Sequence, residues 1–183
     1  MIMSLFRRTP KNRNRQIVDS VHAAITDAAR QPVLFSDWGI PDTPIGRYES
    51  ISLHMILFLH RTREGEDALS GLSQDVLDQF FRDVDHSIRE LGVGDPGVPK
   101  RMKKLARMFY GRMGNYWQAL DDNDSSAFAE TVSRNIAAHD ANAVAAGEIA
   151  SYALRVRDHF ASQTDADILA GKLSFPAAFA GER

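Results

Sequence analysis

The sequence predicts an all-α protein: a compact single-domain bundle of about six helices around one central, buried helix. Apolar residues recur at intervals of three and four along most of the chain, which is typical of amphipathic helices. The sequence shows neither alternating strand patterns with hairpin turns nor a repeat of fixed length. With 183 residues, the chain has the length of one domain with a single core.

The first helix is expected over residues 13–29, where apolar residues form one stripe. Residues 30–42 contain Pro32, Gly39 and Pro41 and are expected to connect it to the next helix. Phe35 and Trp38 make this connector too apolar for a free linker, so we expect it to pack over the bundle. The alternative is that these two aromatic side chains mark a docking site.

Residues 44–63 are expected to form the central helix. Asp42 or Thr43 can cap its start, and Pro44 suits the first helical position. The segment is apolar on every side except at a few positions, so its charges require partners. Arg47 and Glu49 lie on opposite faces at 100° per residue, and we expect each to be a structural ion tie to a different neighbouring helix.

Four further helices and one short helical turn are expected after the central helix. A third helix is expected after residues 63–71, with Ser73 as its cap and Leu72 and Leu77 as a hydrophobic staple around it. Gly92 is expected to stop this helix before a rigid turn over residues 92–99. Later helices are expected over residues 98–120, 125–138 and 143–162, with a short helical turn over residues 165–170. Phe175 and Phe179 are expected to fold back on the core.

The composition excludes several classes of chemistry. The chain has no cysteine, so disulfides, thiolate metal sites and a cysteine nucleophile are impossible. Phosphate-binding loops, dinucleotide fingerprints and the G-x-S-x-G elbow are missing from the sequence. Asp83 and His86 form one Asp-x-x-His pair, but a di-metal bundle needs two Glu-x-x-His pairs. We therefore expect no enzyme activity, no cofactor and no metal.

The charge is unevenly distributed. Residues 1–15 contain five cations and no acid, so we expect a basic flexible arm here, followed by one helical domain over residues 16–183. Arg7, Arg8 and Lys11 could contact an anionic membrane, or the arm could be a disordered tail. The apolar run 51–59 is too short to span a bilayer, and the first residues do not form a secretory signal.

The helix at 98–120 has a strongly basic face. Cations in the first turns of a helix are disfavoured by its dipole, and Gly111 and Gly114 each lower helix stability by roughly 1 kcal/mol relative to alanine. Breaks of local rules often occur at functional sites, so we expect a partner-binding surface here. Its expected members are Lys100, Lys103, Lys104, Arg107, Tyr110, Gly111, Gly114 and Trp117.

Three alternatives to a protein partner remain for this face. Lysine clusters also attract RNA phosphates and anionic membranes. In a purely structural interpretation, the two glycines accommodate another helix of the same chain and the lysines serve solubility.

Three stretches resemble one protein family: GRYESISLH at 46–54, DVDHSIRELGVGDPGVPKRMKKLA at 83–106 and FYGRMGNYWQAL at 109–120. They are similar to the ubiquinol-cytochrome c chaperone family, in the same order. The resemblance implies an all-helical, non-enzymatic assembly factor of the respiratory ubiquinol-cytochrome c reductase that binds newly made cytochrome b. It also implies a peripheral position on the cytoplasmic face of the bacterial inner membrane, or on the matrix side in an organelle.

Organellar members of this family act near the ribosome with a small partner protein, and the resemblance gives no reason to expect DNA as a partner. The short N-terminus is typical of a bacterial or already processed chain. The alternative function is a helical RNA- or ribosome-binding module, and a further alternative is a membrane-surface or metal-dependent enzyme.

Overall fold

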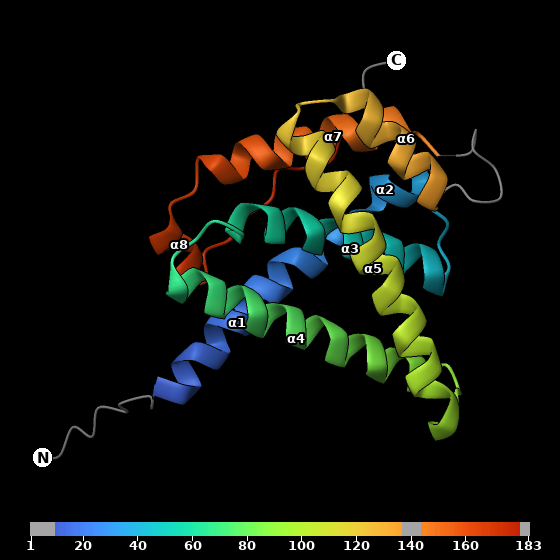
Figure 1. Ribbon diagram of the computed structural model, residues 1–183, viewed down its shortest axis with the longest axis horizontal. Coiled ribbons are helices and arrows are strands. Elements are labelled where there is room, and N and C mark those ends of the chain that lie inside the picture. Colours follow the sequence, from blue (N-terminus) through green and yellow to red (C-terminus); the bar gives the residue numbers. More distant parts are fainter. Residues whose placement is uncertain (1–9, 137–143, 180–183) are drawn as a thin grey trace, which may run out of the picture.

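The computed structural model describes residues 10–136 and 144–179, and over these ranges it contains helices and no strand (Figure 1). This confirms the all-α fold. The elements are α1 (Pro10–Ala29), α2 (Pro32–Ser36), α3 (Pro44–Thr62), α4 (Asp67–Glu90), the 3-10 turn η1 (Asp95–Gly97), α5 (Val98–Asp121), α6 (Ser125–Ile136), α7 (Ala146–Ala161) and α8 (Asp165–Leu169). In the described ranges, no helix is both long and apolar enough to cross a membrane.

Helix α3 is the centre of the fold. It contacts α1, α4, α5, α6 and α7, and most of its residues are buried on all sides. Thr43 caps its start by accepting a hydrogen bond from the backbone N–H of Gly46 at 3.1 Å, and Pro44 occupies the first turn. A Cβ atom at Gly46 would lie 1.9 Å from the carbonyl oxygen of Pro41, so only glycine lets the connector pass this closely over α3.

The connector between α1 and α3 packs onto the bundle. It contains the short helix α2, and Trp38 behind it is only 1% exposed. The Trp38 ring lies 5.6 Å from the ring of Tyr152 in α7, and its carbonyl accepts a hydrogen bond from Ala145. Phe35 is partly buried against the core. These aromatic side chains therefore belong to the packing and do not form a docking site.

Helix α4 differs from the expectation at its start. It begins at Asp67, so Ser73 is not its cap but lies inside the helix and donates to the carbonyl of Leu69 at 2.8 Å. The added first turns bury Leu69 against the core, while Gly71 is exposed and tolerated within the helix. Gly92 adopts φ +79° just after the helix and ends it, as expected.

Helix α1 begins at Pro10, so residues 10–15 are helical. They were expected to belong to the flexible arm instead. Asn14 attaches this start to α4 by donating to Asp75 at 3.0 Å. The predicted membrane contacts Arg7 and Arg8 lie outside the described residues, as does the side chain of Lys11.

The C-terminal tail folds back only in part. The ring of Phe175 lies 4.8 Å from that of Phe160 and 5.6 Å from that of His54. The backbone N–H of Ala178 donates to the side chain of Gln31 at 2.7 Å, which fastens the tail to the end of α1. Phe179, in contrast, is 66% exposed, so the expectation that it packs on the core was wrong.

Candidate functional site

The candidate site is the outer face of α5, here called the α5 surface. Its inner face packs against α3, α4, α6 and α7. On the outer face, Tyr110 is 51% exposed although it is a large aromatic residue. The other exposed residues predicted for this surface are Lys100, Lys103, Lys104, Arg107, Gly111 and Gly114.

The two glycines of the α5 surface face open space. A Cβ atom at Gly111 or at Gly114 would have no atom within 4 Å outside the helix's own backbone and the adjoining residues. Within the described ranges, then, no other helix of the chain occupies this position, and the purely structural explanation of the glycines is wrong. They lower helix stability, and none of the described residues packs against them to offset this cost.

The cations of this face differ in their pairing. Lys100, Lys103, Lys104 and Arg107 are exposed and form no ion pair in the part of the chain that the structure describes. Arg112, in the same basic run, instead points inward and pairs with Glu49. The basic run therefore divides into an outer set that is free to meet a partner and one inward arginine.

The pair between Glu49 and Arg112 is buried. The Glu49 side chain is 6% exposed, and its carboxylate joins α3 to α5 by accepting from the Arg112 guanidinium. Burial raises the pKa of Glu49 above its usual value, while the hydrogen bond from Arg112 opposes that rise.

Arg47 contradicts the expectation of an ion tie between helices. Its side chain is 68% exposed, and its Nε donates to Asp42 at 2.6 Å, just before α3 starts. Gly46 and Tyr48 on either side of it are buried, but the Arg47 side chain itself points to solvent at the start of α3.

Tyr110 and Trp117 have different roles at the edge of the α5 surface. Tyr110 lies 6.1 Å from Phe81 of α4, beside an open hollow of about 450 Å³ lined by Asp78, Phe81, Arg82 and Asp85. Trp117 donates from its indole N–H to the carbonyl of Ile56 at 3.2 Å, so it is fastened to α3. Of the two aromatic side chains predicted as anchors, Tyr110 alone presents a largely exposed ring.

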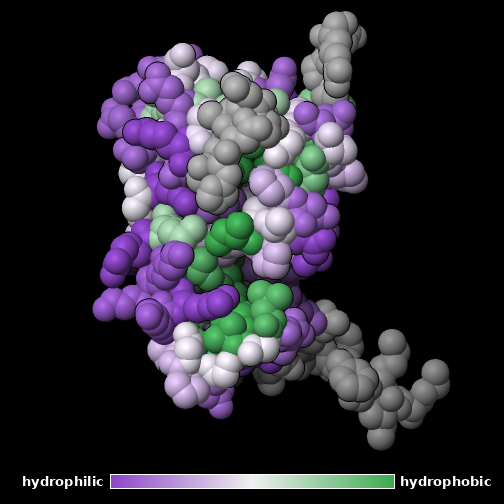
Figure 2. Space-filling model, turned by 90° about the vertical axis from the view of Figure 1, so that its right-hand side faces the viewer, coloured by the Kyte–Doolittle hydropathy of each residue, from purple (hydrophilic) through white to green (hydrophobic). Residues whose placement is uncertain are grey.

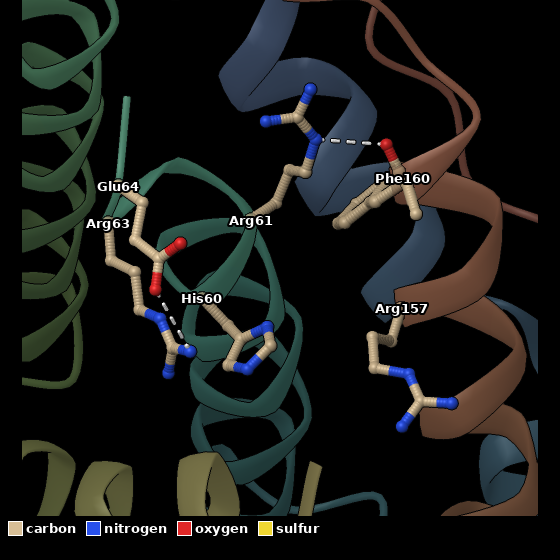
Figure 3. A pocket seen from close by; sticks show the side chains of 7 residues that line it. His60, Arg61, Arg63, Glu64, Arg157 and Phe160 are labelled. Carbon is tan, nitrogen blue, oxygen red and sulfur yellow. Dashed lines mark hydrogen bonds and ion pairs between the residues drawn. The ribbon is translucent and has the colours of Figure 1, made fainter. Parts of the chain in front are cut away.

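A second hollow of about 190 Å³ lies between the end of α3 and α7 (Figure 3). Its three arginines already serve the fold. Arg61 donates to the carbonyls of Phe160 and Gln163 at the end of α7, at 2.9 and 2.8 Å. Arg157 donates to the carbonyl of Leu120 at the end of α5, at 2.7 Å. The carbonyls of Phe160 and Leu120 also accept a hydrogen bond from the backbone three residues on, so each guanidinium group adds a second donor at the C-terminal end of a helix.

The third arginine of this hollow, Arg63, donates through both terminal nitrogens to Asp121, at 2.9 and 2.8 Å. That contact, with a further one from His60, lowers the pKa of Asp121 to about 2. Because the cations of the hollow are held by carbonyls and carboxylates, its arrangement is that of a structural junction between α3, α5 and α7.

His54 is fully buried and belongs to a network of hydrogen bonds. Its Nδ1 lies 2.8 Å from the carbonyl of Ser50, which can only accept, so the proton sits on Nδ1. Its Nε2 then accepts from the hydroxyl of Tyr152 at 3.1 Å, and that hydroxyl accepts from Gln31 at 3.3 Å. Burial lowers the pKa of His54 to about 4. The imidazole is therefore neutral and out of reach of a substrate at neutral pH.

Over residues 10–136 and 144–179, no group of three or more His, Asp and Glu side chains is placed to hold an ion. The one Asp-x-x-His pair, Asp83 and His86, is split between two contacts: Asp83 lies 3.5 Å from His22, and His86 pairs with Glu90.

Comparison with known proteins gives two matches. A family model described as ubiquinol-cytochrome C chaperone matches residues 36–175, which include the whole of the α5 surface. The crystal structure of the Cbp3 homolog from Brucella abortus is similar in sequence and fold, with 48% identity and a TM-score of 0.86. The match covers 97% of this chain and 98% of that one. Among the curated proteins there is no match.

Proposed function

Because this chain belongs to the ubiquinol-cytochrome c chaperone family, we propose that it is a non-enzymatic assembly chaperone that binds newly made cytochrome b. Family membership supports the role in assembly of the ubiquinol-cytochrome c reductase. The identity of the client, its binding site and the place of action are the proposal. We place the protein peripherally on the membrane face where the client is synthesised, which is cytoplasmic in a bacterium.

The open glycines of α5 carry the proposal of a client site. Gly111 and Gly114 have no side chain, and no described residue outside their own stretch of helix fills the space above them, so the backbone of a client helix can approach α5 closely there. Tyr110 offers an exposed aromatic ring beside them, the residue type that often anchors an interface. Lys100, Lys103, Lys104 and Arg107 form the basic end of the same surface.

The test is the double substitution Gly111→Leu with Gly114→Leu. Leucine favours helix, and the space outside both positions is open, so the chaperone should stay folded. Two bulky side chains would hold a client helix away from α5. We expect recovery of cytochrome b with the tagged chaperone to fall roughly tenfold, corresponding to about 1.4 kcal/mol of binding free energy.

A matched control is Gly71→Leu in α4, which is also an exposed helical glycine with open space around it. This variant should recover cytochrome b as the parent does. Normal recovery with the folded double variant would contradict the client site. Loss of helical circular dichroism in the double variant would instead mean that the chain itself needs the space.

The free cations of the α5 surface also suit a second candidate, an RNA- or ribosome-binding module, since phosphates attract lysine clusters. This candidate predicts a different result for the same variants. Ribosomal RNA would be recovered with the parent and equally with the glycine double variant, and cytochrome b would be missing from both.

A further inference from the structure

The end of the molecule where α4 meets α5 combines free cations with an exposed apolar side chain. This end, here called the α4–α5 tip, comprises residues 91–104. Leu91 follows α4 and is 57% exposed. Figure 2 shows the molecule from the right-hand side of Figure 1, and an apolar area bordered by strongly hydrophilic side chains lies in the lower part of this view.

The acids and bases near the tip are paired unequally. Asp85 and Asp95 both bind Arg89, and Glu90 lies 3.1 Å from His86. Lys100, Arg101, Lys103 and Lys104 are all exposed, and none forms an ion pair among the described residues. Residues 91–104 contain these four cations and one acid, Asp95, so the net charge of this end is positive and its complement is an anionic partner.

We propose that the α4–α5 tip docks on an anionic lipid bilayer, with Leu91 in the interfacial region and the four cations on lipid phosphates. A bilayer offers apolar and anionic groups in one plane, which matches this combination. Single-stranded RNA is usually held by stacking on aromatic side chains, and the large exposed side chain of the tip is aliphatic.

The shape of the molecule supports a planar partner. In Figure 1 the tip projects at the lower right, and the first turn of α1 reaches the same lower edge at the left. Arg15 is exposed in this part of α1. A flat surface could therefore touch both ends at once. The α5 surface then rises from the bilayer, with Gly111 about 16 Å along the helix from Lys100 at ~1.5 Å per residue.

The probe is co-sedimentation of the full chain with vesicles of phosphatidylcholine and phosphatidylglycerol at 3:1. We expect Lys100→Gln with Lys104→Gln to lower the partition coefficient about thirtyfold, since each cation contributes roughly a factor of five near an anionic surface. Leu91→Ser should lower it about tenfold through lost apolar burial. All variants should bind weakly to vesicles of pure phosphatidylcholine. Added inorganic phosphate should not displace the protein from the anionic vesicles.

Two matched controls use sites away from the tip. Arg30→Gln with Arg134→Gln removes the same charge, and Ile45→Ser removes a half-exposed apolar side chain at the start of α3. Both should bind vesicles as the parent does.

Parental binding by folded Leu91→Ser, or by folded Lys100→Gln with Lys104→Gln, would overturn the proposal. Equal losses in the charge control would also overturn it, because net charge alone would then explain binding. The assay contains no cytochrome b, so it is independent of the proposed client. The variant Gly111→Leu with Gly114→Leu should bind vesicles normally even where it fails to recover the client.

Discussion

Replacing Glu49 with alanine is expected to lower the free energy of unfolding by roughly 3 kcal/mol, because it leaves the Arg112 charge buried without its partner. Both side chains lie between α3 and α5, where little water can reach them. Arg112→Ala should lower the free energy of unfolding by a similar amount, since it leaves the Glu49 carboxylate buried without its partner. Urea unfolding followed by circular dichroism measures the loss in both variants.

Arg47→Ala is the control for this prediction, and it should leave the free energy of unfolding close to that of the parent. Arg47 is also a charged residue of α3, but its pair with Asp42 is exposed to solvent. Equal losses in the Glu49 and Arg47 variants would contradict the importance of burial. So would a Glu49→Ala variant as stable as the parent.

The stability of the protein is expected to fall between pH 6.5 and pH 4 by about 3 kcal/mol on account of His54 alone. In the unfolded chain this histidine takes up a proton near its ordinary pKa of 6.5, whereas burial holds its pKa at about 4 in the fold. The contribution is therefore fully present above pH 6.5. It is lost as the pH falls toward 4, because the unfolded state then binds the additional proton.

The variant His54→Gln isolates this effect, because glutamine does not titrate. Its unfolding free energy, measured in urea at steps between pH 7 and pH 4, should fall less steeply than that of the parent. The variant His86→Gln is the control: this histidine is exposed, so its removal should leave the parental slope. A His54→Gln variant with the parental slope would show that other groups control the acid response, such as His22 and His60, whose pKa values burial also lowers.

The central helix could be predicted in detail because its signals are local. Thr43, Pro44 and the apolar run that follows lie within one stretch of sequence, and the structure places α3 where they indicate. The start of α4 was missed for the opposite reason. Ser73 with Leu72 and Leu77 around it suggests a cap with a hydrophobic staple, but burial of Leu69 extends the helix beyond this point. Tertiary packing overrode local preference there.

The candidate site shows the same limit. Periodicity placed Lys100 and Gly111 on one face of α5, and both are exposed. Periodicity gives the direction of a side chain, however, and not its depth in the molecule. The Arg47 side chain is exposed although Gly46 and Tyr48 beside it are buried, and Arg112 meets Glu49, 63 residues away in the sequence, because α3 and α5 come together. Neither outcome could be derived from spacing within one helix.

The network around His54 has a consequence for the synthesis of the chain. His54 and its partner Tyr152 are separated by 98 residues, and Ala178 joins the network through Gln31 over 147 residues. At about 5–20 residues per second, the ribosome needs roughly 5–20 s after His54 to make its partner. During that time α3, the most apolar helix, lacks the contacts that α7 makes with it. A protein that assists the assembly of others thus completes its own core only in the last stage of translation.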